Sequence, residues 1–285
     1  MSAVWPNQVT LGSFVADNSG DESDVRMVTK LTGWDAPPIR LSITDRAQQD
    51  GGYDAVGLYG PRVITLEGYV KRLDHATAKA VADALCAISP RSLQQFTVSE
   101  EGVAPRSAQV RLMVGAEPTW RRPDAFHYTL QVKAPDPLKY GAAWSGSAPL
   151  VGVTGTGRVW PRAWPTGWGV PVGVTPGSVQ VPNSGTVTYW PKLRIDGPVP
   201  NPTVTCNQTG DFVRVRRSVL AGQWLDIDLG ARRVLLNGQI SLRHVTTFGG
   251  NWLAVPAGGA SFSWSADGAD VNARLTVNGY QGAWT

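Results

Sequence analysis

Apolar residues recur at every second position in short runs that end at turn-forming residues. In the first half of the chain such runs cover residues 8–15, 25–31, 62–70, 108–115 and 126–132. A period of two is that of a half-buried β-strand, because successive side chains point to opposite faces of a sheet. The 32 glycines and 21 prolines supply frequent turns between these runs. The pattern therefore predicts an all-β protein.

The run at 62–70 illustrates the expected alternation. Ile64, Leu66 and Val70 fall on one face, which we expect to be buried, while Arg62 and the other polar residues of the run are expected on the opposite, solvated face. Gly68 lies inside the run and is a candidate β-bulge.

One segment, residues 73–90, has helical rather than alternating periodicity. Its apolar residues are spaced three or four apart, at Ala78, Val81, Leu85 and Ile88. Asp74 is a suitable N-cap, and Pro90 lies beyond the end. We expect one helix over 74–88, packed on the sheet by its apolar stripe, since so short a helix is marginal alone.

In the second half, short strand-like runs return at close spacing. They cover residues 186–195, 212–220, 223–229, 232–238, 261–268 and 272–280, and Asn237-Gly238 is a hairpin signal. Six or more short strands of this kind favour a β-sandwich or jelly roll.

The composition changes between these two halves. Residues 141–191 contain ten glycines and seven prolines, two charged residues (Arg158 and Arg162), and five of the twelve tryptophans. A chain of 285 residues exceeds one typical domain. We predict an N-terminal β domain at 1–135, a hinge and extended strap at 136–191 that belongs to the second domain, and a C-terminal β-sandwich at 192–285.

Pro135, Asp136 and Pro137 interrupt the strand-like run that precedes them. Asp136 in such a stiff segment is either a catalytic carboxylate or punctuation between domains. The two prolines fix φ and force Ala134 and Asp136 into extended geometry, so the strand cannot continue. We interpret the segment as an interdomain hinge, in which Asp136 forms a turn and Tyr140 pins the exit.

Charge and polar motifs give little sign of chemistry. A net charge of +4 without a basic cluster does not indicate sequence-specific nucleic-acid binding. The start of the chain lacks a signal-peptide pattern and no run of about 18 apolar residues occurs, so we expect no membrane insertion. His75, His127 and His244 lie apart, and Cys86 and Cys206 fit no metal or redox spacing, so we expect reduced, partly buried thiols, no metal site and no cofactor.

Two groups of carboxylates are candidate sites. Asp226 and Asp228 share one strand face about 7 Å apart, a separation found in glycosidases, but a structural role beside a turn or an arginine is favoured. The acidic stretch 17–24 suggests calcium, yet Val28 stands where an EF-hand requires glutamate, which favours a solvated loop. The protein is therefore not expected to be an enzyme.

The tryptophan content, twelve residues, raises the alternative of a carbohydrate-binding module, because aromatic faces stack on flat ligands. Four tryptophans are the candidates for a glycan or partner surface: Trp160, Trp164, Trp168 and Trp252. Assembly interfaces use the same residue type, so both interpretations stay open.

Six segments in succession carry a resemblance that spans most of the chain: residues 53–70, 126–141, 157–169, 181–204, 220–238 and 251–264. In this order they resemble the distal tail proteins of long-tailed bacteriophages, in the form often labelled minor tail protein. The resemblance implies an N-terminal ring-forming β domain of sandwich or split-barrel type with one helix, followed by a galectin-like jelly-roll sandwich.

The same resemblance implies a structural function in the virion. Such proteins form a six-membered ring at the tail tip, assembled in the host cytoplasm. The ring is a hub that joins the tail tube to tip or baseplate proteins and leaves a channel for DNA. The implied partners are copies of the same chain, the tail tube protein and tail-tip proteins, with a host glycan as a further candidate.

Overall fold

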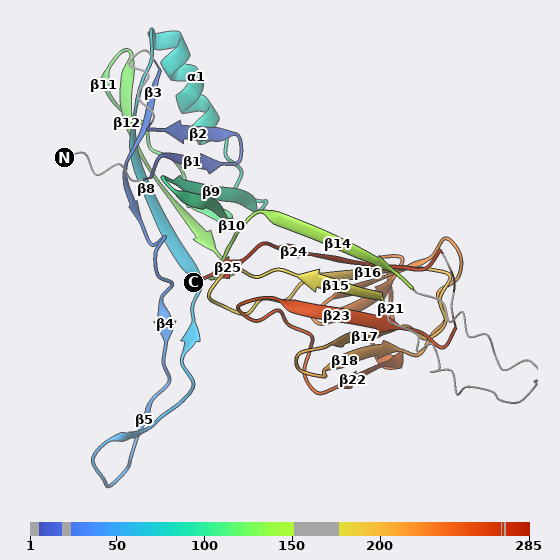
Figure 1. The fold of residues 1–285 in the computed structure, drawn as a ribbon. Helices are drawn as coiled ribbons and strands as arrows, with labels where there is room; N and C mark the ends of the chain where they lie inside the picture. Colours follow the sequence, from blue (N-terminus) through green and yellow to red (C-terminus); the bar gives the residue numbers. More distant parts are fainter. Residues whose placement is uncertain (1–5, 19–23, 151–176, 269, 271) are drawn as a thin grey trace, which may run out of the picture. The chain divides into compact units, whose positions relative to one another are not determined.

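The computed structural model describes residues 6–18, 24–150, 177–268, 270 and 272–285. In these residues the protein is built almost wholly of β-strands, with one α-helix and one short 3₁₀ helix, η1 (Arg243–Val245). This confirms the predicted all-β class with one helix. The chain divides into two compact units: unit 1 is Met1–Ala142 with Trp284–Thr285, and unit 2 is Ala143–Ala283. Figure 1 colours them by position along the chain.

Unit 1 contains one large antiparallel sheet. Its strands are β1 (Gln8–Leu11), β2 (Phe14–Asp17), β3 (Val25–Thr32), β8 (Arg62–Lys71), β9 (Gln94–Glu100), β10 (Val103–Val114), β11 (Thr119–Arg122), β12 (Ala125–Ala134), β13 (Lys139–Tyr140) and β25 (Ala283–Trp284). The order runs β11-β12-β8-β3-β2-β1-β9-β10-β13-β25, and β12 also pairs with β10. That second pairing closes the sheet on itself, so that unit 1 is barrel-like and buries most of its strand edges.

The interior of unit 1 is filled by alternate residues of these strands. It includes Val9, Leu11, Phe14, Ile64, Leu66, Phe96, Val98, Val110, Tyr128, Leu130 and Val132. The rings of Phe14 and Tyr128 meet edge to face at 5.5 Å between centroids, a favoured aromatic geometry.

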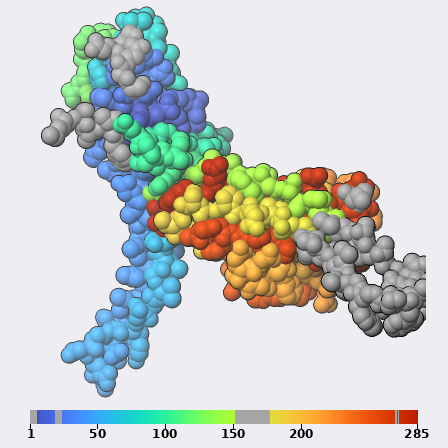
Figure 2. All heavy atoms as spheres, in the orientation of Figure 1, coloured from blue at the N-terminus to red at the C-terminus, as the bar shows by residue number. Residues whose placement is uncertain are grey.

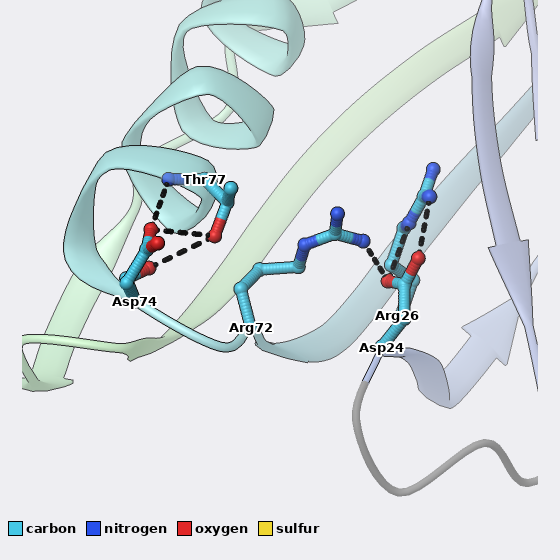
Figure 3. A network of polar contacts seen from close by, with 5 residues as sticks. All are labelled: Asp24, Arg26, Arg72, Asp74 and Thr77. Atoms are coloured by element: carbon cyan, nitrogen blue, oxygen red, sulfur yellow. Dashed lines mark hydrogen bonds and ion pairs between the residues drawn. The ribbon is translucent and has the colours of Figure 1, made fainter.

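Helix α1 (His75–Cys86) covers part of this interior. Its N-cap is Asp74, as predicted, whose carboxylate accepts a hydrogen bond from the Thr77 N–H at 2.8 Å (Figure 3). Ala82 and Leu85 enter the core, and Val81 and Ile88 pack against it. Among the described residues, no helix has the length and apolar character needed to cross a membrane.

Three predictions for unit 1 are wrong in detail. Residues 8–15 form a hairpin, β1 and β2, rather than one strand, because Gly12 takes the positive φ of a tight turn (58°). Arg62 lies on the buried face of β8 and is 0% exposed. The irregularity expected at Gly68 lies in the neighbouring strand, where the register of β3 shifts between Val28 and Lys30.

Unit 2 is a sandwich of two antiparallel sheets (Figure 1). The six-stranded sheet has the order β14-β24-β16-β19-β20-β21. Its strands are β14 (Ala143–Pro149), β24 (Arg274–Tyr280), β16 (Lys192–Asp196), β19 (Trp224–Asp228), β20 (Arg233–Leu236) and β21 (Ile240–Ser241). The five-stranded sheet is β15 (Gly177–Val181), β23 (Ala260–Ser265), β17 (Thr203–Cys206), β18 (Phe212–Val215) and β22 (Thr246–Gly249), in that order.

The predicted hairpin turn at Asn237-Gly238 is confirmed. Both residues have positive φ, 51° and 70°, and they connect β20 to β21. Several predicted strands are shorter than expected: the run at 186–195, for example, yields β16 only from Lys192 onward, because Pro191 cannot donate to a ladder.

Candidate functional site

The segment that follows β12 closes on itself through Asp136. Its Oδ1 accepts the Leu138 N–H at 3.0 Å, and its Oδ2 accepts the Tyr140 hydroxyl at 2.7 Å. These are the contacts of a turn-forming side chain, in which both carboxylate oxygens are engaged. Residues 136–142 fall in unit 1, a few positions beyond the domain boundary expected from the sequence.

The buried guanidinium of Arg62 holds this segment against the body of unit 1. Its Nη2 donates to the Pro137 carbonyl at 2.7 Å, and its Nη1 donates to the carbonyls of Gly33 (3.2 Å) and Trp34. Burial lowers the pKa of Arg62, and the charges of Asp35 and Asp136 oppose that shift. Since arginine stays protonated in proteins, three carbonyl oxygens here stabilise a permanent cation.

Lys139 is a second buried cation beside Arg62. Its Nζ donates to the Asp35 carbonyl at 3.0 Å and lies 5.5 Å from the centre of the Trp34 ring. Burial, and then repulsion from Arg62 and Arg106, lowers the pKa of Lys139 to about 8. The cluster thus ties the chain before β4 to the segment after β12.

Residues 38–60 form a two-stranded arm between β3 and β8. It consists of β4 (Ile39–Arg40) paired with β7 (Leu58–Tyr59), and β5 (Thr44–Asp45) paired with β6 (Gly52–Tyr53). In Figures 1 and 2 the arm extends beyond the packed atoms of unit 1. It carries exposed apolar side chains: Ile39, Leu41, Ile43, Tyr53, Val56, Leu58 and Tyr59.

The arm has almost no core of its own. Ile43 lies against Gly52 and Leu41 against Gly57, where an added Cβ would meet their methyl groups at 2.5 and 3.1 Å. Val56 remains 85% exposed. An isolated two-stranded ribbon is marginally stable in water, and a run of exposed apolar residues marks an interaction surface. This arm was not predicted from the sequence, although Ile39, Leu41 and Ile43 alternate as strand residues do.

The two carboxylates considered for glycoside hydrolysis serve the structure. Asp226 accepts the indole N–H of Trp224 at 2.9 Å. Asp228 accepts the Ala231 N–H at 2.8 Å through Oδ1 and pairs with Lys192 at 3.5 Å through Oδ2. They share the outer face of β19, as expected, and each is engaged by neighbouring groups.

Of the four candidate tryptophans, the structure describes Trp252. Its ring is tilted by 41° against that of Phe248, with centroids 4.3 Å apart, and the Arg243 guanidinium lies over both rings, 5.2 Å from that of Trp252. Trp160, Trp164 and Trp168 lie outside the described residues. A glycan or partner role for these four residues stays a prediction.

The structure describes the two ends of the acidic stretch 17–24, which are residues 17–18 and Asp24. Asp24 is bound by the guanidinium groups of Arg26 (2.9 Å) and Arg72, as Figure 3 shows. The hydrogen bonds from Arg26, with those from Arg72, lower the pKa of Asp24 to about 2 against the effect of burial. Within the described ranges no group of three metal-ligating side chains occurs.

The histidines and cysteines also lie apart. His75 contacts the Pro123 carbonyl at 2.7 Å and the Trp120 ring, while His127 packs on Tyr69. Both cysteines are free thiols, but only Cys206 is buried. Cys86 is exposed, which corrects the expectation that both are partly buried.

Comparison with known proteins identifies the second unit. Residues 184–280 match the family model of the siphovirus-type tail component, C-terminal domain. No curated protein sequence is similar enough to count as a match.

Two solved structures share the fold of the chain. One is the crystal structure of the Dit protein of phage SPP1, described as a paradigm of the hub adsorption apparatus in phages that infect Gram-positive bacteria. It is 12% identical, with a TM-score of 0.61 over 98% of this chain and 99% of that one. The other is the phage P2 baseplate in its activated conformation with calcium, 10% identical, with a TM-score of 0.51 over 96% of this chain and 99% of that one.

The shared fold covers both units, and the family match covers most of the second. Siphovirus-type tail components are part of the phage particle, at its tail. Residues 184–280 carry the C-terminal domain of the siphovirus-type tail components, and the resemblance of the chain to the distal tail proteins of long-tailed bacteriophages is confirmed.

Proposed function

We propose that this protein is the ring-forming hub subunit of a phage tail tip. Identical copies, six in the ring, join the tail tube to the tip or baseplate proteins and leave a channel for DNA. The observation that carries this proposal is the shared fold with the SPP1 hub protein over 98% of the chain. The segment Pro135–Pro137 serves as the stiff exit of unit 1.

The arm supports self-association. Its apolar side chains remain exposed among the described residues, and its ribbon edges offer unpaired backbone groups. When such an arm lies on a different surface of the next copy, the contact is heterologous, and successive copies close into a ring if the rotation allows it.

A structural rather than enzymatic function is supported by the carboxylates. Asp136 and Asp228 accept hydrogen bonds from their own turns, and Asp226 accepts one from Trp224 on the same strand. Each of the three carboxylates therefore has a structural role within the chain itself.

The test measures the mass of the full chain in solution over a wide concentration range, by mass photometry and negative-stain imaging. We expect particles of six times the 30.5 kDa chain mass with a central hole. The variant Ile39→Asp/Val56→Asp places two charges on the arm, and we expect it to stay monomeric and folded.

Leu220→Asp is the matched control, because Leu220 is 61% exposed but lies outside the arm. It should assemble as the parent chain does. If the parent chain stays monomeric both alone and when mixed with its tail tube protein, the proposed ring is wrong. If the arm variant assembles normally, the arm is not the contact.

A further inference from the structure

A hollow of about 370 Å³ lies on unit 2, where β14, β24 and the chain entering β16 meet. We call it the aromatic hollow. Trp144, Trp190 and Tyr280 line it, together with Ser145, Lys192 and Asn278. Its volume falls within the range of about 300–1,000 Å³ that is usual for small-ligand sites.

Polar groups form a row across the sheet beside these rings. Ser145 pairs with Asn278, Asn278 with Lys192, and Lys192 with Asp228, so the four side chains share the outer face. The Ser145 hydroxyl lies 2.9 Å from the Asn278 Oδ1, and the Lys192 Nζ lies 3.5 Å from the Asp228 Oδ2. The row offers hydroxyl, amide and ammonium donors next to amide and carboxylate acceptors.

Two of the three aromatic residues, Tyr280 and Trp144, are held by contacts within unit 2. The buried Tyr189 hydroxyl donates to the Tyr280 carbonyl at 2.8 Å and accepts the Tyr280 N–H at 3.3 Å. Trp144 lies along its own strand, over Gly146, where a Cβ would meet the ring at 2.4 Å. Trp190 is 49% exposed and lies two residues before the exposed Lys192, with Pro191 between them. A site built on strands is well ordered, which lowers the entropy lost on binding.

The charges at the hollow select a neutral ligand. Lys192 is paired with Asp228, so the row presents donors and acceptors without a net charge. A phosphate or other strong anion would have to displace Asp228, and a cation would have to displace Lys192. A polyhydroxylated ligand satisfies both partners at once, because each hydroxyl both donates and accepts.

We propose that the aromatic hollow binds a neutral saccharide. The apolar C–H face of a sugar ring lies on the exposed ring of Trp190, whose π-face carries negative charge density. Its hydroxyl groups bond to Asn278, Lys192 and Asp228. This inference goes beyond the hub function and does not depend on it.

The outer face of the sheet continues the site. The next row on the same face is Ser147, Thr276, Arg194 and Asp226, about 7 Å further along the strands. Asp226 is held by Trp224, and the Arg194 guanidinium lies 4.6 Å from the centre of the Trp224 ring. A second sugar unit thus meets another set of hydroxyl, guanidinium and carboxylate groups, so an oligosaccharide binds better than a monosaccharide.

The test titrates the full chain with maltotetraose, cellotetraose and chitotetraose, each up to 10 mM, and records tryptophan fluorescence and saturation-transfer NMR. These neutral probes differ in linkage and substituents. We expect at least one to bind, and Trp190→Ala to weaken that binding on the order of tenfold, the effect of losing one stacked ring.

Two further variants separate binding from folding and from other surfaces. Asn278→Ala removes an exposed amide without touching the rings, and should weaken binding several-fold while the thermal unfolding stays as in the parent. Trp252→Ala is the matched control, since Trp252 belongs to the cluster with Phe248 and Arg243. It should leave the affinity unchanged.

Three results would overturn the proposal. The first is that none of the three sugars binds. The second is that binding occurs but survives Trp190→Ala. The third is that decaproline competes for the same residues with higher affinity, which would make the hollow a site for proline-rich peptides. Ring assembly of Trp190→Ala, measured separately, reports on the hub function alone.

Discussion

Asn183 ties together three segments of unit 2, and its removal gives the sharpest stability prediction. The side chain is 3% exposed. Its Oδ1 accepts the N–H groups of Gly185 (3.0 Å) and Ala283 (3.1 Å). Its Nδ2 donates to the carbonyls of Val187, Val255 and Pro256 at 2.9–3.1 Å.

The cost of Asn183→Ala follows from what each partner retains. The Val255 and Pro256 carbonyls also accept the N–H groups of Tyr189 and Gly259, so they keep a donor. The Gly185 and Ala283 N–H groups lose Oδ1, and a buried unpaired donor costs about 1–3 kcal/mol. We therefore expect unit 2 to lose roughly 2–6 kcal/mol, a large share of the usual ~5–15 kcal/mol.

Urea unfolding followed by hydrogen exchange, resolved by peptide, measures this loss separately for each unit. Protection of unit 2 should fall while that of unit 1 stays unchanged. Asn207→Ala is the matched control: this exposed asparagine bonds to Ser261 and Ser263, and its loss should cost under about 1 kcal/mol. Equal effects of the two substitutions would refute the assignment of the cost to orphaned buried donors.

Two further predictions concern unit 1. The pKa of Lys139 is about 8 in the folded chain and about 10.4 in the unfolded chain. Between these pH values the unfolded chain binds more protons, so the free energy of unfolding rises with pH. The rise is roughly 1.5 kcal/mol from pH 8 to 9.5. Denaturation curves measured across this pH range should lose the rise in Lys139→Met. They should keep it in the control Lys133→Met, since Lys133 is exposed. A rise that persists in Lys139→Met would exclude Lys139 as its source. Asp136→Ala should lower the free energy of unfolding by about 1 kcal/mol, because its hydrogen bonds to Leu138 and Tyr140 are lost. Tyr140→Phe removes one of these bonds and should cost less. If Asp136→Ala abolished assembly while stability stayed intact, a purely turn-forming role would be contradicted.

Features governed by neighbouring residues were predictable from the sequence. The N-cap at Asp74 and the hairpin at Asn237-Gly238 follow from local chemistry, in which a side chain or a positive φ suits one position. The alternation of the strands gave the fold class for the same reason. The turn at Gly12 was missed because glycine is also compatible with a strand interior.

Features that depend on distant partners were not predictable. Arg62 shares the face of Ile64 and Leu66 by the period of two, but a buried charge is not expected without partners, and the carbonyls of Trp34 and Pro137 that stabilise it lie far away in the chain. The aromatic hollow likewise needs the pairing of β14 with β24, which brings Trp144 beside residues more than a hundred positions later. Exposure of the arm is equally hidden, since alternation is the same whether a strand is covered or not.

The guanidinium of Arg62 has a mechanical consequence. It donates hydrogen bonds to the backbone carbonyls of Gly33 and Trp34, just before the arm, and of Pro137, just after β12. A force on the arm is therefore transmitted to the segment after β12 through the hydrogen bonds of one buried, permanently charged side chain. One side chain thereby joins two points that about a hundred residues of chain separate.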